Sequence, residues 1–244
     1  MVSATSFLFA ALAAVVSAAP TCNQGATPTL PQVGAGTELP APAASLVLKK
    51  IAIGHGIQNY SCADTTANSS ATGALAVLYD VTSFYPGTKK TGISKQVWDN
   101  LPSTVLWRTE IPLNTQYGSQ YGADPTNPFP APADLNCPGV STVKFLGHHY
   151  FSSAGVPTFD LSAASLKASV KKLDSINAPS NADKGITGSG AVQWLQLGDT
   201  GSGGSQGVSL VYRVVTAGGV AQACSVAGAG VQSVPYTAYY WFYG

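Results

Sequence analysis

The feature that most constrains the fold is a series of short β-branched and aromatic segments separated by clusters of glycine and proline. Segments of this kind are typical of β-strands. A polar, glycine-rich stretch at 198–207 is typical of a hairpin loop between two of them. This pattern predicts an all-β domain, either a β-sandwich or an open β-barrel, with long Pro/Gly-rich loops. The strand-like segments are residues 46–54, 57–62, 73–81, 144–151, 191–197, 208–215 and 234–243.

Two regions depart from this pattern. Between residues 84 and 143, turn-forming residues are so frequent that we expect long loops, a strand or two and one helical turn near residues 95–101. The segment 163–176 is ambiguous, because Leu166, Val170 and Leu173 have helical spacing. A strand there would place a lysine on each face and bury little, so local propensity favours a helix.

The first residues have the organisation of a secretory signal peptide. An apolar core at residues 7–16 is too short to span a bilayer, and small residues at Val16 and Ala18 favour cleavage after Ala18. A buried N-terminal helix is the alternative. We expect a secreted, extracellular protein with no membrane span after cleavage. Its expected parts are a signal peptide (1–18), an irregular arm (19–45) and a secreted β-domain (46–244).

The cysteines and sequons fit that compartment. Four widely spaced cysteines contain no C-x-x-C pair, and an even number in an oxidising exterior predicts two disulfides, with three pairings open. Asn59 and Asn68 begin N-glycosylation sequons, of which Asn68 lies in the more polar surroundings. Charged residues make up only 9% of the chain and the net charge is +1. The basic patch that binds nucleic acid is therefore missing.

Residues 51–59 begin like a dinucleotide-binding fingerprint, because Gly54-His55-Gly56 follows a strand-like run. The third glycine position is Asn59, and no helical pattern opens there. A helix N-terminus is what would bind the pyrophosphate. We therefore expect no nicotinamide or other cofactor, and we interpret the glycines as a turn or bulge.

Several segments together resemble a family of secreted proteins of unknown function found in filamentous fungi and in bacteria. The resemblance extends over residues 46–244 and includes Cys224. Many fungal members carry the label malate dehydrogenase, an activity against which the incomplete fingerprint argues here. The matching segments are 56–62 (G-x-Q-x-Y-x-C), 147–151, 192–197, 211–219 and 234–243.

The resemblance has structural implications. The family looks β-rich, which favours a strand at 166–176. Its shared cysteines imply a Cys62–Cys224 disulfide, which leaves Cys22–Cys137 as the second pair. At three positions the chain departs from the family, whose usual acid, Asn and Pro are replaced. The residues found there are Tyr239, Val215 and Gln193.

The histidines are the candidate metal ligands. They are His55, His148 and His149. Adjacent side chains on a strand point to opposite faces, so the alternative is one histidine in the core and one at the surface. The chain has no G-x-S-x-G elbow and no visible carboxylate pair.

Aromatic residues are the candidate ligand contacts. Trp98 and Trp107 lie in the loop-rich region, and Tyr239 and Trp241 lie in the aromatic C-terminal segment. They could stack on sugar rings or on a partner, or pack in the core. We expect a binding protein for a cell-wall glycan or a host or surface protein. An extracellular hydrolase or metal-dependent enzyme is the alternative.

Overall fold

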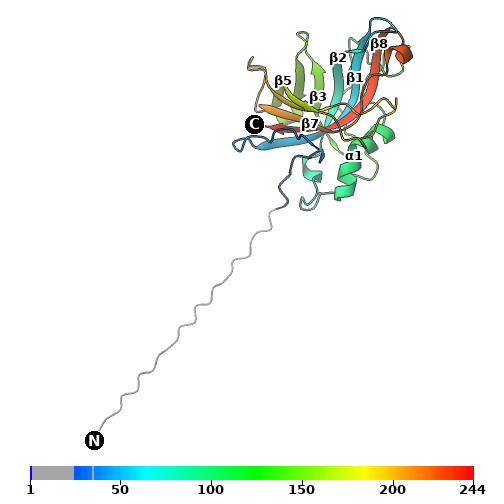
Figure 1. Ribbon diagram of the computed structural model, residues 1–244. Helices are drawn as coiled ribbons and strands as arrows, with labels where there is room; N and C mark the ends of the chain where they lie inside the picture. The colour runs from blue at the N-terminus through cyan, green and yellow to red at the C-terminus, as the bar shows by residue number, and fades with distance from the viewer. Residues whose placement is uncertain (2–24, 35) are drawn as a thin grey trace.

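The computed structural model describes Met1, residues 25–34 and residues 36–244. Within them, eight antiparallel strands, each paired with the next along the chain, form a closed barrel because β8 also pairs with β1 (Figure 1). The all-β prediction is confirmed, and the sheet is a closed barrel rather than a sandwich or an open barrel. The strands are β1 (Leu48–Cys62), β2 (Ser70–Asp80), β3 (Lys144–Phe151), β4 (Pro157–Leu161), β5 (Leu166–Ile176), β6 (Trp194–Asp199), β7 (Leu210–Gly218) and β8 (Gly230–Tyr243).

The segment 166–176 is strand β5, so the helix favoured by local propensity is wrong and the strand implied by the family resemblance is right. β5 pairs with β4 on one side and β6 on the other. Ala168 and Val170 are almost completely buried. Neighbouring strands thus supply backbone partners and burial that outweigh local propensity. The sequence pattern did not predict strand β4.

Side chains of one alternating set fill the barrel interior. Tyr236, Tyr240, Phe242 and Phe159 are its largest members and are at most 1% exposed. Small residues of β1 and β2 face them, among them Ala52 and Ala76. The interior is therefore a packed core of large rings set against small residues.

Gly54 and Gly56 lie inside the continuous strand β1, so the predicted turn or bulge at these residues is wrong. A Cβ at Gly54 would lie 2.6 Å from Cε2 of Tyr240, and one at Gly56 would lie 2.0 Å from the Leu75 carbonyl oxygen. These glycines give space to an interior ring and to the adjacent strand. The register irregularity falls at Asn59 and Tyr60, where β1 continues to Cys62 instead of a helix beginning.

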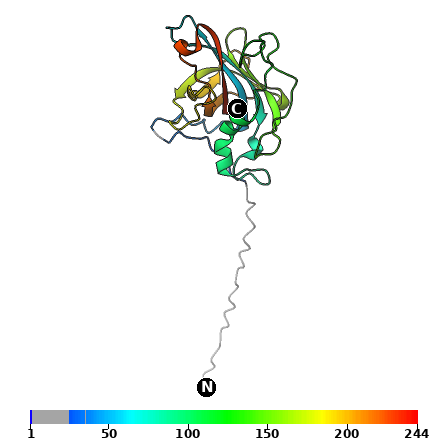
Figure 2. The same cartoon turned by 90° about the vertical axis from the view of Figure 1, so that its right-hand side faces the viewer.

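Helix α1 (Lys95–Arg108) packs outside the barrel wall (Figures 1 and 2). The Oγ of Ser94 caps it by accepting the Val97 amide at 3.2 Å. The predicted helical turn near 95–101 is confirmed and continues to Arg108. Trp98, Leu101 and other residues of α1 bury the outer face of β1, β7 and β8. The protein thus has one core inside the barrel and another beneath α1.

The remaining regular elements are short. They are helix α2 (Cys224–Ala227) and 3₁₀ turns at Thr82–Phe84 and Ser162–Ala164. Residues 25–34 and 36–47 contain no helix or strand. No helix in the described part of the chain is long and apolar enough to cross a membrane.

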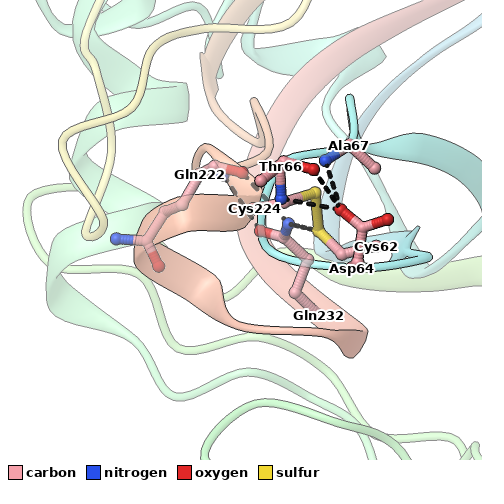
Figure 3. Close-up of a disulfide and its surroundings, with 7 residues drawn as sticks. All are labelled: Cys62, Asp64, Thr66, Ala67, Gln222, Cys224 and Gln232. Atoms are coloured by element: carbon pink, nitrogen blue, oxygen red, sulfur yellow. Dashed lines mark hydrogen bonds between the residues drawn. A yellow bond between two sulfur atoms is a disulfide. The ribbon is translucent and has the colours of Figure 1, made fainter.

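Cys62, at the end of β1, forms a disulfide with Cys224, the first residue of α2 (Figure 3). This is the pairing that the resemblance implies. The Gln232 side chain braces the same region, since it bonds to both the amide and the carbonyl of Gln222. Cys137 is buried and is not disulfide-bonded to any described residue. Cys22 and residues 2–18 of the predicted signal peptide lie outside the described residues, so the Cys22–Cys137 pair stays a prediction.

Candidate functional site

The three histidines that sequence analysis proposed as metal ligands do not converge. His55 and His148 lie on the outer face, in register with Val77 of the strand between them. His149 points into the barrel, where its ring stacks on Phe159 with centroids 4.1 Å apart. No group of three or more His, Cys, Asp or Glu side chains in the described chain is arranged to hold a metal ion. The predicted three-histidine site is thus not assembled.

Each histidine is held by its local surroundings instead. His55 places its ring nitrogens 3.1 Å from the Glu110 carbonyl and 3.4 Å from the Tyr236 carbonyl, and His149 places Nδ1 2.9 Å from the Thr158 carbonyl. Desolvation by burial lowers the pKa of both residues to about 4, so both are neutral at neutral pH. Burial also lowers the pKa of His148.

Three of the four predicted ligand-contact aromatics are buried. Tyr239 and Trp241 are 0% exposed, because α1 and its flanking loops cover this face of β8. Their prediction as surface contacts is therefore wrong. Trp98 is 4% exposed and stacks on Tyr239, so the prediction of an exposed contact there is also wrong. Trp107, also on α1, is 54% exposed.

A groove lies between α1, the connection from β5 to β6, and β7. It consists of adjoining hollows of about 320, 600 and 610 Å³, a size typical of ligand pockets. We call it the α1 groove. The residues shared by two or more of these hollows are Asp99, Pro179, Asn181, Trp194 and Val215.

The polar groups of the α1 groove are carboxylates, amides and hydroxyls. Asp99, Asn100, Ser103, Asn181 and Asp183 line its central hollow. The nearby cation, Lys95, places its Nζ 2.6 Å from Asp99 Oδ2. Such a lining can donate to and accept from hydroxyl groups but offers little to an anion.

Trp194 also lines the α1 groove, and its indole nitrogen is a candidate ligand donor. Its Nε1 is buried and has no hydrogen-bond partner among the described residues. A buried donor without a partner costs free energy, which a ligand acceptor would recover.

Trp107 stands beside the same groove in a fixed orientation. Its Nε1 donates a hydrogen bond of 2.7 Å to Asp183 Oδ2. The same carboxylate accepts from the Ser103 hydroxyl and, through Oδ1, from the Gly185 amide at 2.8 Å. One groove residue thus anchors an exposed indole.

Val215, on the groove wall, has a left-handed backbone with φ of +48° at an irregularity in the pairing of β7 with β8. A β-branched residue is strained in this conformation, whereas Asn tolerates it. The Asn that the family resemblance implies at this position would therefore carry less strain than Val215 does. Strain of this kind clusters at functional sites.

Sequence reasoning found only part of this groove. Trp107 and Trp98 are predictable from the sequence because they are aromatic residues in a loop-rich region. Asp183 and Trp194 carried no local signal, since only the closed barrel brings them next to α1. The only sign of unusual backbone at Val215 is that it differs from the Asn that the family resemblance implies there.

The two predicted glycosylation sites lie in different surroundings. Asn68 is exposed in the turn between β1 and β2. Asn59 is half-buried in β1, where its Oδ1 accepts a hydrogen bond of 2.8 Å from the Ser233 hydroxyl. Asn68 is thus the more accessible of the two.

The sequence profile of a family described as "Protein of unknown function (DUF3455)" matches residues 42–244. No curated protein and no solved structure is similar enough to match the chain.

Proposed function

The chain belongs to the DUF3455 family, whose function is unknown, and we propose that it is an extracellular binding protein that holds a neutral glycan in the α1 groove. The groups that would contact the glycan are an exposed tryptophan, two carboxylates and a set of amides and hydroxyls.

The observation that carries the proposal is the hydrogen bond from Trp107 to Asp183. An indole that is 54% exposed normally loses rotamer freedom when a ligand binds. Here the bond to Asp183 fixes the ring in advance. A flat, preoriented apolar surface next to hydrogen-bonding groups matches a sugar ring, which has apolar C–H faces and hydroxyls at its edge.

The charge of the groove favours a neutral ligand. Asp99 and Asp183 are acidic, and Lys95 is paired with Asp99. Carboxylates and amides bind vicinal hydroxyls well, and the two carboxylates repel phosphate or sulfate groups. We therefore assign the cell-wall glycan, rather than an acidic polymer, as the ligand class.

An extracellular location agrees with the cysteine chemistry. Disulfides such as Cys62–Cys224 persist in oxidising compartments and are rare in the cytosol. The predicted signal peptide supports the same location.

The direct test is binding of the purified mature protein to an array of neutral oligosaccharides, followed by calorimetric titration of the best ligand. We expect saturable binding that Trp107→Ala weakens at least tenfold, which corresponds to about 1.4 kcal/mol. Because Trp107 is exposed, this variant should unfold at the wild-type temperature. Val226→Ala, at an exposed position in α2 far along the chain from the groove, is the matched control and should bind normally.

Two results would contradict the proposal. One is the absence of binding to every neutral glycan on the array, and the other is equal affinity in Trp107→Ala and wild type. Release of new reducing ends from the bound oligosaccharide would instead favour the hydrolase alternative.

A further inference from the structure

The barrel interior contains a second cavity, separate from the α1 groove. Its volume is about 60 Å³. It lies toward the end of the barrel that carries the β1–β2 and β3–β4 turns. We call it the barrel-end cavity. Its lining combines four polar residues, Gln58, His149, Arg213 and Tyr240, with six apolar ones, Ala74, Phe151, Pro157, Phe159, Leu195 and Leu197.

Arg213 makes this cavity positive. Its Nε and Nη2 donate to the Gln193 carbonyl at 3.2 and 2.9 Å, and it forms no salt bridge with a carboxylate of any described residue. No acidic residue lines the cavity. A half-buried cation without a counter-ion is costly, and a bound anion would offset that cost.

Gln58 adds an unused donor. Its Nε2 is buried and has no hydrogen-bond partner among the described residues. The phenol of Tyr236 lies next to this amide and also bonds to the Tyr240 hydroxyl at 2.9 Å. The cavity therefore presents a guanidinium and a poorly satisfied amide N–H, which together suit a negatively charged oxygen acceptor.

His149 and Tyr240 limit the size and shape of the space. The Nδ1 of His149 lies 2.9 Å from the Thr158 carbonyl, and the ring is stacked on Phe159. A single water needs only about 10–15 Å³ by this measure, so 60 Å³ admits several heavy atoms but no large ligand. The apolar wall suits a short alkyl group better than a fully hydrated ion.

From this combination we infer that the barrel-end cavity binds a small monocarboxylate of about the size of acetate. Its oxygens interact with Arg213 and Gln58, and its alkyl end contacts the apolar wall. The site is independent of the glycan proposal, because it lies inside the barrel and shares no lining residue with the α1 groove.

The test is a titration of the full mature protein with sodium acetate at constant ionic strength, followed by calorimetry and by the thermal unfolding temperature. We expect saturable acetate binding that raises the unfolding temperature. Arg213→Gln should weaken binding at least tenfold. Arg108→Gln, which removes the other arginine of the chain from an exposed position on α1, should bind acetate normally.

A second variant keeps the inference testable if Arg213→Gln fails to fold. Gln58→Leu removes an unpartnered amide, so it should fold and still weaken acetate binding several-fold. No saturable effect of acetate, or undiminished binding in the folded variants, would overturn the inference. Chloride binding in place of acetate would overturn the carboxylate assignment. Trp107→Ala should leave acetate binding unchanged, so the two proposals can fail separately.

Discussion

The Tyr239 hydroxyl donates a hydrogen bond to the backbone carbonyl of Trp98 at 2.8 Å, and the two rings stack with centroids 4.5 Å apart. In a regular helix this carbonyl would accept the amide of residue 102. Residue 102 is proline, which has no N–H. Tyr239 therefore replaces the donor that Pro102 removes. Thr237, on the same face of β8, also donates to the Pro102 carbonyl.

The first prediction follows from this replacement. Tyr239→Phe leaves the Trp98 carbonyl buried without that partner and should lower the free energy of unfolding by about 1–3 kcal/mol. In a Pro102→Ala background the helix regains its own amide donor. Tyr239→Phe should therefore lower the free energy of unfolding less in that background than in the wild type. Urea denaturation of the four proteins measures the coupling. Strictly additive effects would show that the two residues are not linked in this way.

The second prediction concerns the glycines of β1. Gly56→Ala places its Cβ against the backbone of Leu75, and Gly54→Ala places its Cβ against the Tyr240 ring. Both should destabilise the protein by more than about 2 kcal/mol. Only the new Cβ of Gly54→Ala meets a side chain. Tyr240→Leu should therefore restore part of the stability lost in Gly54→Ala but none of that lost in Gly56→Ala. Chemical denaturation measures both pairs, and equal compensation would argue against this packing.

The third prediction is a loss of stability in mild acid. The pKa of His55 and of His149 is about 4 in the folded protein, against about 6.5 when unfolded. Between these values the unfolded chain binds more protons, so the free energy of unfolding rises with pH from about 4 to 6.5 and levels off above. Each histidine contributes up to about 3 kcal/mol. Hydrogen bonds lower the pKa of exposed carboxylates such as Asp64 below its usual value. These groups therefore change the free energy of unfolding only below the pH range in which the histidines do.

Urea denaturation at several pH values between 4 and 8 checks this dependence. A folded His149→Gln variant should show a clearly smaller rise over the window than wild type. A stability that is flat between pH 4 and 6.5 would mean that the buried histidines can be protonated without cost.

The fourth prediction compares neighbours on β7. Val215 is half-buried with φ of +48°, whereas Val214 is fully buried. Val215→Asn relieves backbone strain, so its unfolding free energy should stay within about 1 kcal/mol of wild type. Val214→Asn buries an unpaired amide and should cost about 3 kcal/mol or more. Thermal and urea unfolding of both variants is the measurement, and similar losses in the two would rule out strain at Val215.

The local character of the chain can be read from its residues alone. Segments such as 144–151 and 234–243 alternate or are rich in β-branched and aromatic residues, and they form strands β3 and β8. The prediction of these strands succeeds because their alternation of residue types lies within each segment. The family resemblance added the strand β5 and the Cys62–Cys224 pair.

How these strands close into a barrel, and which distant residues they bring together, depends on long-range contacts. Pairing of β8 with β1 closes the barrel, buries Trp241 beneath α1 and sets Asp183 beside Trp107. Where Pro102 removes an amide donor from α1, Tyr239, more than 130 residues away, donates to the unpaired carbonyl. Contacts between residues so distant in sequence leave no local periodicity, because their free energy arises only after the chain has folded.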